Sequence, residues 1–211
     1  MLQALKIKIN LSPKEVEENI KKLNFAFMFA PNYHSAMKYV GPIRKKIGKR
    51  TIFNLIGPLS SPAKVERQVV GVFDRNLLKI FSSALKNLNI KFAWVVNSED
   101  GLDEISPYQK THVVQLKRGE ISEMIIDPEQ LNIKADNFQK LVGKDAGYNS
   151  QKIIEIFKGE DNDFSKAVSL NAAAGLIVSE KETNFKNAYE MSRNYLLSGK
   201  TLEHLKKLNY V

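Results

Sequence analysis

The pattern of apolar and polar positions begins with a short amphipathic segment. Ser12-Pro13-Lys14-Glu15 has the form of a capping box with proline at the first helical position, and Val16, Ile20 and Leu23 follow at helical spacing. The spacing predicts a helix from Pro13 to about Leu23. A continuous apolar run, FAFMFAP, comes next, and HSAMKYVGPIRKKIG then has helical spacing that Gly41-Pro42 interrupts, which predicts a kinked or broken helix.

The middle of the chain changes to a strand pattern. RQVVGVF and KFAWVV read as buried strands, and the amphipathic helix NLLKIFSSALKNL lies between them. Such a βαβ unit predicts a parallel pair of strands with the helix crossing one face in the right-handed sense. THVVQLK and ISEMIID, joined by Arg118-Gly119, predict an antiparallel hairpin, although Gly119 alone leaves the turn type open.

The remainder of the chain is mostly helical in pattern. The predicted helices are SQKIIEIFKG, FSKAVSLNAAAGLIVS and ETNFKNAYEMSRNYLLSG, with Gly199 as a C-cap, and a last helix from Thr201 to about Leu208. Helices at both ends of a βαβ unit and a hairpin indicate the α/β class.

Composition narrows the functional classes. The 211 residues are 43% apolar, enough for one substantial core. The absence of cysteine excludes disulfides, cysteine-ligated zinc and a thiolate nucleophile. The first residues lack the apolar core of a signal peptide, and no run approaches the roughly 18 apolar residues of a membrane span, so we expect a cytoplasmic protein without membrane contact.

The positive charge lies mostly at one end. Residues 1–50 contain 11 Lys and Arg against 3 Glu, a net charge of +8 out of the total of +9. A localised positive field suits a phosphate, a carboxylate or nucleic acid. The alternative is a solvated, lysine-rich helix face.

GLDEIS, residues 101–106, places Asp103 and Glu104 side by side directly after a predicted strand. Magnesium usually takes one or two protein carboxylates and leaves its other positions to water and substrate phosphates. Ligands of α/β sheets bind at the carboxyl ends of the strands. The pair is therefore a candidate Mg²⁺ site, with ordinary surface charge as the alternative.

Two further segments contain candidate binding residues. In APNYHSAMKYVGPIRKKIGKR, Arg44 offers a planar fork suited to a carboxylate or phosphate, and His34 precedes it by ten positions. In NLIGPLSSPA, the turn at Gly57-Pro58 lets the backbone approach a planar ligand closely. A surface arginine, a packed histidine and a plain turn are the alternatives. No GxGxxG, Walker, HExxH or GxSxG motif is present.

Together these segments resemble anthranilate phosphoribosyltransferase, an enzyme family of tryptophan biosynthesis. The resemblance extends from about Leu11 to Gly199 and is most specific in RTIFNLIGPLSSPA and GLDE, with VVGVFDRNLLKIFSSALKNL and SLNAAAGL in support. It implies a central mixed, largely parallel sheet flanked by helices, with part of a helical subdomain, as in the nucleoside phosphorylase and class-II phosphoribosyltransferase fold.

The resemblance also implies the chemistry. The family joins the amine of anthranilate to C1 of phosphoribosyl pyrophosphate and releases pyrophosphate, with Mg²⁺ as the essential ion and no protein nucleophile. Asp103 and Glu104 match its metal-binding acids, Arg44 matches the arginine that meets the anthranilate carboxylate, and His34, Gly57 and Pro58 match residues around the aromatic substrate.

One departure from the family pattern is large. Family members have an N-terminal helical region, a GTGGD-type glycine-rich loop and a KHGNR-type segment, and none of these occurs in this sequence. We therefore expect residues 1–60 to be the remnant of the helical subdomain together with the substrate-side helices, and 61–211 to be the α/β domain. We also expect the isolated chain to be inactive or nearly so, unless a separate polypeptide supplies the rest.

Three alternatives stay open: a non-catalytic relative that binds nucleic acid, a pyrimidine nucleoside phosphorylase, and a structural fragment. The basic first fifty residues offer few positions for base stacking, which disfavours nucleic acid. If packing partners are missing, apolar surface around FAFMFA, Met37 and Ile43 should be exposed and should favour a homodimer or other self-association.

Overall fold

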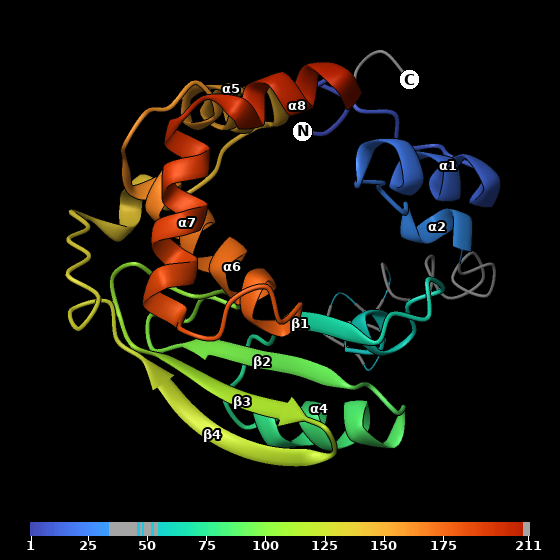
Figure 1. The fold of residues 1–211 in the computed structure, drawn as a ribbon, viewed down its shortest axis with the longest axis vertical. Coiled ribbons are helices and arrows are strands. Elements are labelled where there is room, and N and C mark those ends of the chain that lie inside the picture. Colours follow the sequence, from blue (N-terminus) through green and yellow to red (C-terminus); the bar gives the residue numbers. More distant parts are fainter. Residues whose placement is uncertain (34–45, 47, 49–51, 53–54, 209–211) are drawn as a thin grey trace. The chain divides into compact units, whose positions relative to one another are not determined.

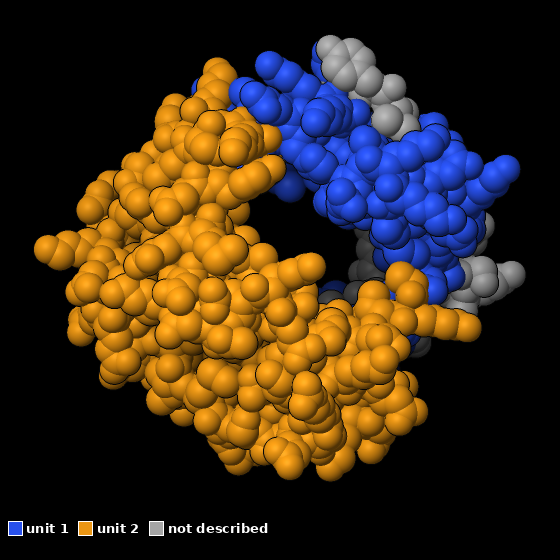
Figure 2. Space-filling view, viewed as in Figure 1, with its two compact units in different colours: residues 1–62, 143–154, 201–211 blue, residues 63–142, 155–200 orange. Residues whose placement is uncertain are grey.

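The computed structural model describes residues 1–33, 46, 48, 52 and 55–208. Its contacts divide the chain into two units, shown in blue and orange in Figure 2. The first unit comprises residues 1–62, 143–154 and 201–211, and the second comprises 63–142 and 155–200. The domain boundary expected at residues 60/61 stays a prediction. The helix expected across Gly41-Pro42 lies outside the described residues.

The second unit contains a four-stranded sheet in the order β1-β2-β3-β4 (Figure 1). Its strands are β1 (Arg67–Gly71), β2 (Phe92–Ser98), β3 (Thr111–Lys117) and β4 (Glu120–Ile126). β1 and β2 are parallel, while β2–β3 and β3–β4 are antiparallel. The sheet is mixed, as expected, but its parallel part is confined to the βαβ unit, so the described sheet is less parallel than the resemblance implied.

The βαβ unit forms because its strands contain continuous apolar runs, whereas the segment between them has apolar residues at helical spacing. Every residue of β2 is buried, as a strand covered on both faces requires. Helix α4 (Leu77–Asn87) connects β1 to β2 and contacts β2 and β3. It buries the stripe Leu78, Phe81 and Leu85. The predicted parallel pair and its crossover helix are confirmed.

The predicted hairpin is also confirmed, and the structure settles its turn. Arg118 and Gly119 have φ angles of +51° and +85°, so both central residues lie in the left-handed region that a type I′ turn requires. Strand β4 follows as the edge strand, with Ile121 and Ile125 exposed. The turn thus places an arginine, rather than the usual asparagine or aspartate, at the tip of the hairpin.

Helices α6 (Asp163–Val178) and α7 (Phe185–Leu197) cover the face of the sheet opposite α4 (Figure 1). Helix α6 packs against β1, β2 and α7. The core between them includes Trp94 and Phe185, whose ring centroids are 5.6 Å apart. The second unit therefore has three layers, α4, the sheet, and α6 with α7.

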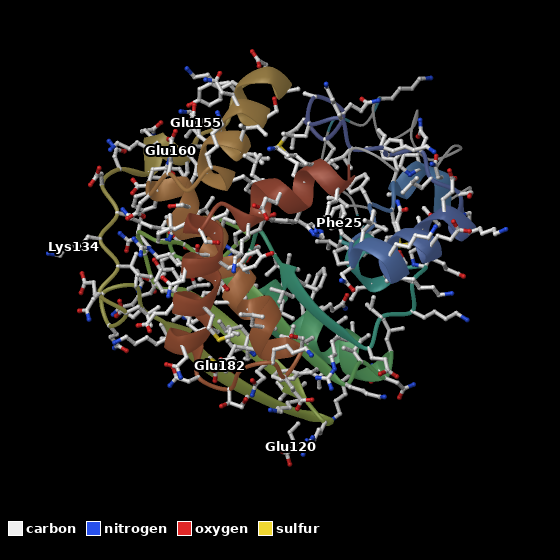
Figure 3. All side chains as sticks on the ribbon, turned by 45° about the horizontal axis from the view of Figure 1, so that its top comes forward. Phe25, Glu120, Lys134, Glu155, Glu160 and Glu182 are labelled. Atoms are coloured by element: carbon white, nitrogen blue, oxygen red, sulfur yellow. The ribbon has the colours of Figure 1, made fainter. Side chains whose placement is uncertain are left out.

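The first unit is helical in its described part. It contains α1 (Pro13–Leu23), α2 (Ala30–Tyr33) and the short 3₁₀ helix η2 (Gly57–Leu59), together with most of α5 (Ala146–Phe157) and α8 (Lys200–Leu208). Helix α1 begins with the predicted capping box, in which Ser12 Oγ accepts from Glu15 N at 3.3 Å and Glu15 accepts from Ser12 N at 2.8 Å. Phe25, labelled in Figure 3, is 39% exposed.

The C-terminal helices agree with the sequence pattern. Gly199, at φ +77°, directly follows the C-cap Ser198 of α7 and has the left-handed backbone typical of a helix end. None of the helices formed by the described residues is long and apolar enough to cross a membrane.

Candidate functional site

Asp103 and Glu104 lie in the loop that leaves the carboxyl end of β2. The loop reverses directly after the strand, because Gly101 N donates to Ser98 O at 3.0 Å and Ser98 N donates to Leu102 O at 3.0 Å. Gly101 has φ +90°, which a side chain would strain. The acids therefore sit where α/β sheets bind ligands, as the sequence predicted.

Asp100 holds the loop from inside. Its carboxylate accepts from the Ser98 hydroxyl at 2.5 Å, from Leu102 N at 3.3 Å, and from the Ser106 hydroxyl. Ser106 is fully buried, and its backbone N–H donates to Thr111 Oγ1 at 3.1 Å. These bonds tie both ends of the segment that carries Asp103 and Glu104 to β2 and β3. The Asp100 carboxylate therefore stabilises the loop, while the side chains of Asp103 and Glu104 remain exposed.

Asn171 of α6 fixes the peptide that follows Glu104. Its Oδ1 accepts from Ile105 N at 2.9 Å, and its Nδ2 donates to Ile105 O at 3.0 Å and to Ala167 O at 2.9 Å. The Ile105 side chain is fully buried in the core. One amide thus satisfies both backbone groups of Ile105, and it links the acid loop to the helix that covers the sheet.

Gly71, the last residue of β1, brings the carboxyl end of this strand next to the loop that carries Asp103 and Glu104. A Cβ atom at this position would lie 1.6 Å from the carbonyl oxygen of Asp103. Only glycine permits this approach of the two backbones. The acid pair is consequently held between the carboxyl ends of β1 and β2.

The two acids are exposed and repel each other. Among the described residues, neither carboxylate has a hydrogen-bond or ion-pair partner. Partial loss of water around its carboxylate, and then the negative charge of Asp103, raise the pKa of Glu104 above its ordinary value. The residue as a whole remains exposed, so the carboxylate keeps access to solvent and to ligands.

The two carboxylates fit a magnesium ion that has few protein ligands. A dication would relieve the repulsion between the two carboxylates, whose hard oxygens suit Mg²⁺. Within residues 1–33, 46, 48, 52 and 55–208, no group of three or more His, Asp or Glu is arranged to hold a metal. The pair therefore fits an ion that takes most of its ligands from water or from a bound phosphate.

The other predicted site residues belong to the first unit or lie outside the described residues. Gly57 and Pro58 begin η2, and the Ser60 hydroxyl donates to Ile56 O at 2.8 Å at the end of this turn. Nothing lies within 4 Å of a Cβ atom placed on Gly57, so in the described structure this glycine is not required by packing. His34 and Arg44 are outside the described residues.

Sequence reasoning missed Gly71, Asp100 and Asn171 as parts of the site. The signal for Asn171 was present, since a single amide interrupts the apolar stretch of α6. Asn149, in the first turn of α5, accepts from Lys144 N at 2.9 Å through its Oδ1 and so has a local structural role. Gly71 has no comparable signal, because its contact is with a backbone atom 32 positions away. The partners of Asp100 lie within six positions of it, and Ser98 and Ser106 on either side are the local signal that could have marked it as the residue that holds the loop.

Comparison with known proteins identifies one family. A family model described as "Glycosyl transferase family, a/b domain" matches residues 1–202. The anthranilate phosphoribosyltransferase of Pelagibacter ubique (strain HTCC1062) is 70% identical over 211 residues, which is 100% of this chain and 64% of that protein. That of Aquifex aeolicus (strain VF5) is 39% identical over 98% of this chain and 61% of its own length.

Solved structures give the same result for the fold. The anthranilate phosphoribosyltransferase from Thermus thermophilus matches with a TM-score of 0.90 and 31% identity, over 99% of this chain and 62% of that one. The Saccharomyces cerevisiae enzyme in complex with PRPP and Mg matches with a TM-score of 0.87 at 23% identity, over 98% of this chain and 60% of that one, which shows a shared fold alone.

These matches confirm the resemblance found in the sequence. The chain spans a little less than two thirds of the length of the relatives it matches.

Proposed function

Because the chain belongs to the glycosyl transferase family of this a/b domain, we propose that it forms the α/β part of an anthranilate phosphoribosyltransferase. In this reaction the anthranilate nitrogen bonds to C1 of phosphoribosyl pyrophosphate, the bond from C1 to the pyrophosphate oxygen breaks, and the amine loses a proton. The observation that supports this most is the acid pair, exposed and without partners among the described residues, at the carboxyl ends of β1 and β2.

The chain's own residues have two tasks in this proposal. Asp103 and Glu104 would hold Mg²⁺, and the ion would supply positive charge to neutralise the departing pyrophosphate. Asp100, Asn171 and Gly71 position the loop so that both carboxylates remain turned outward. No side chain needs to attack C1, which agrees with a sequence that has no cysteine or hydrolase motif.

The remaining assignments rest on the resemblance. Arg44 pairs with the carboxylate of anthranilate, and His34, Gly57 and Pro58 surround the aromatic ring. The reaction belongs to tryptophan biosynthesis and takes place in the cytoplasm. We propose that these 211 residues alone turn over slowly or not at all, because the sequence contains neither the GTGGD-type loop nor the KHGNR-type segment that cradle the phosphates.

The test combines turnover with binding. The chain is assayed for loss of anthranilate with phosphoribosyl pyrophosphate and Mg²⁺, alone and mixed with the segment of the Pelagibacter ubique relative that it does not match. We expect activity only in the mixture, and we expect the double variant Asp103→Asn/Glu104→Gln to abolish it. Family-like turnover by the chain alone would contradict the proposed inactivity.

Magnesium pyrophosphate binding, measured by calorimetry on the chain alone, tests the metal site separately. The double variant should weaken this binding, while Glu129→Gln, at an exposed acid elsewhere in the second unit, should not. Equal binding by both would refute the metal assignment. Binding of duplex DNA that weakens steeply with salt, together with an inactive mixture, would favour the nucleic-acid alternative instead.

A further inference from the structure

The second unit has a basic cavity at the end of the sheet away from the acid pair. The cavity has a volume of about 480 Å³ and lies where β1 and β2 begin and where β3 turns into β4. Five cationic side chains line it, namely Arg67, Lys86, Lys91, Lys117 and Arg118. Among the described residues that line it, the acidic one is Glu180, which follows the end of α6.

Glu180 shows that these cations can converge on one anionic group. Its carboxylate lies 2.5 Å from Arg67 Nη2, 3.7 Å from Lys117 Nζ and 3.8 Å from Arg118 Nη2. Above all the hydrogen bond from Arg67 lowers the pKa of Glu180 below its ordinary value. Arg67 also donates to Val178 O at 2.9 Å through Nη1, so Val178 O and Glu180 together fix the position of its guanidinium group in the cavity wall.

The cavity is not neutralised by its acidic neighbours. Lys91 pairs with Glu66 at 2.7 Å, and Glu180 is shared by three cations. Lys86 has no ion pair within the part of the chain that the structure describes. Five cations thus face two carboxylates, which leaves an excess of three positive charges. The negative ends of helices α4 and α6 reduce this excess without removing it.

Two further acids near the cavity, Glu120 and Glu182, do not neutralise its excess positive charge. Glu120 follows the turn at the tip of the hairpin, and its side chain points outward from the sheet in Figure 3. Glu182 accepts hydrogen bonds from Thr183 N at 2.6 Å and Asn184 N at 2.9 Å, so its carboxylate is engaged in its own loop. Neither residue lines the cavity.

We propose that this basic cavity binds a small molecule with two or more phosphate groups. The excess charge calls for a multiply charged anion, and arginine and lysine together suit phosphate oxygens. The cavity is open to solvent on one side, and its volume is in the range of metabolite-binding sites. The cavity offers no platform for a nucleic-acid base, because the Phe92 ring is 2% exposed and the Lys117 ammonium lies 4.6 Å from its centroid.

The probe is inorganic triphosphate, titrated into the chain by calorimetry in EDTA without Mg²⁺. Without a cation the acid pair repels the probe, so Asp103→Asn/Glu104→Gln should leave this binding unchanged. That control separates the cavity from the proposed catalytic site. Lys86→Ala and Arg118→Asn should each weaken binding about three- to tenfold, since each removes a charge-assisted contact. Asparagine tolerates the left-handed backbone at position 118.

Glu180→Gln provides the decisive comparison because it should act in the opposite direction. Removal of the competing carboxylate should strengthen triphosphate binding by about the same factor. Lys134→Ala is the matched charge control, because Lys134 is exposed on the loop after β4 and points into solvent in Figure 3. It should leave the affinity unchanged.

Three results would overturn the proposal. The first is triphosphate binding that Lys86→Ala and Arg118→Asn leave at the level of Lys134→Ala. The second is weaker binding by Glu180→Gln with an unchanged melting temperature. The third is duplex DNA or an acidic peptide that binds more tightly than triphosphate and responds to the same variants, which would make the cavity part of a macromolecular surface.

Discussion

At the scale of single residues, Gly71 is the position that tolerates a side chain least. Gly71→Ala would place Cβ 1.6 Å from the Asp103 carbonyl oxygen, so β1 or the acid loop must move. We expect a loss of at least about 2 kcal/mol in the free energy of unfolding, measured by urea denaturation.

Gly175→Ala is the control for this substitution, because nothing lies within 4 Å of a Cβ atom there and the position is inside α6. It should be neutral or stabilise by up to about 1 kcal/mol. Equal stability of the two variants would contradict the close approach of Gly71 to the acid loop.

Glu104 provides a prediction about pH. Because its pKa in the folded protein is raised above the ordinary 4.5, its contribution to stability is present at low pH and is lost as the pH rises through the raised pKa. Glu104→Gln should therefore equal the wild type in stability at low pH and be slightly more stable at neutral pH.

An NMR titration of the carboxyl groups checks the cause of this shift. Asp103→Asn should lower the pKa of Glu104, because it removes the negative neighbour. A pKa of Glu104 that does not respond to Asp103→Asn would show that loss of water alone produces the shift.

At the scale of elements, α6 serves as the support of the acid loop through Asn171. Asn171→Ala leaves the buried N–H and C=O of Ile105 without their partner. It should cost about 1–3 kcal/mol of stability and should weaken magnesium pyrophosphate binding, measured by denaturation and calorimetry.

The control is Asn194→Ala, at an exposed position on α7. Both substitutions raise helix propensity by the same amount, so the difference between them isolates the hydrogen bonds. If Asn171→Ala keeps wild-type binding of magnesium pyrophosphate, Asn171 supports only the fold.

Helix α1 depends on its capping box. Ser12→Ala should destabilise the first unit by about 1 kcal/mol, through loss of the N-cap hydrogen bond. Hydrogen bonds from Lys8 and from Ser12 lower the pKa of Glu15 from 4.5 to about 2.

The stabilisation linked to Glu15 is therefore present above its unfolded pKa and is lost as the pH falls from about 4.5 toward 2. Helicity measured by circular dichroism across this range should fall less in Glu15→Gln than in the wild type. An identical pH dependence in both proteins would contradict the assigned pairing of Glu15.

At the scale of the whole molecule, exposed apolar side chains predict self-association. Phe25 is 39% exposed in the first unit, beside the half-buried apolar run that follows it. Sedimentation velocity over a range of concentrations should show a dimer or larger species, and Phe25→Ser should weaken it. Ile80→Ser, at a 63% exposed position on α4, is the control. A monomer at every concentration would contradict this prediction.

The sequence by itself determined the family and most of the longer elements, although not the short helices α2 and η2. The capping box of α1, the buried strands of the βαβ unit and the hairpin were predicted because each depends on local periodicity and turn chemistry. The pair Asp103 and Glu104 was recognisable because both acids directly follow a strand.

Only the tertiary structure decided what holds that pair and what else the unit can bind. Asn171 reaches Ile105 across 66 positions of sequence, and Arg67 reaches Glu180 across 113, so no local pattern reveals either contact. The contact of Gly71 with the Asp103 backbone involves no side chain at all. The basic cavity gathers cations from β1, α4, the position before β2, β3 and the hairpin turn, and they become neighbours only when the sheet forms.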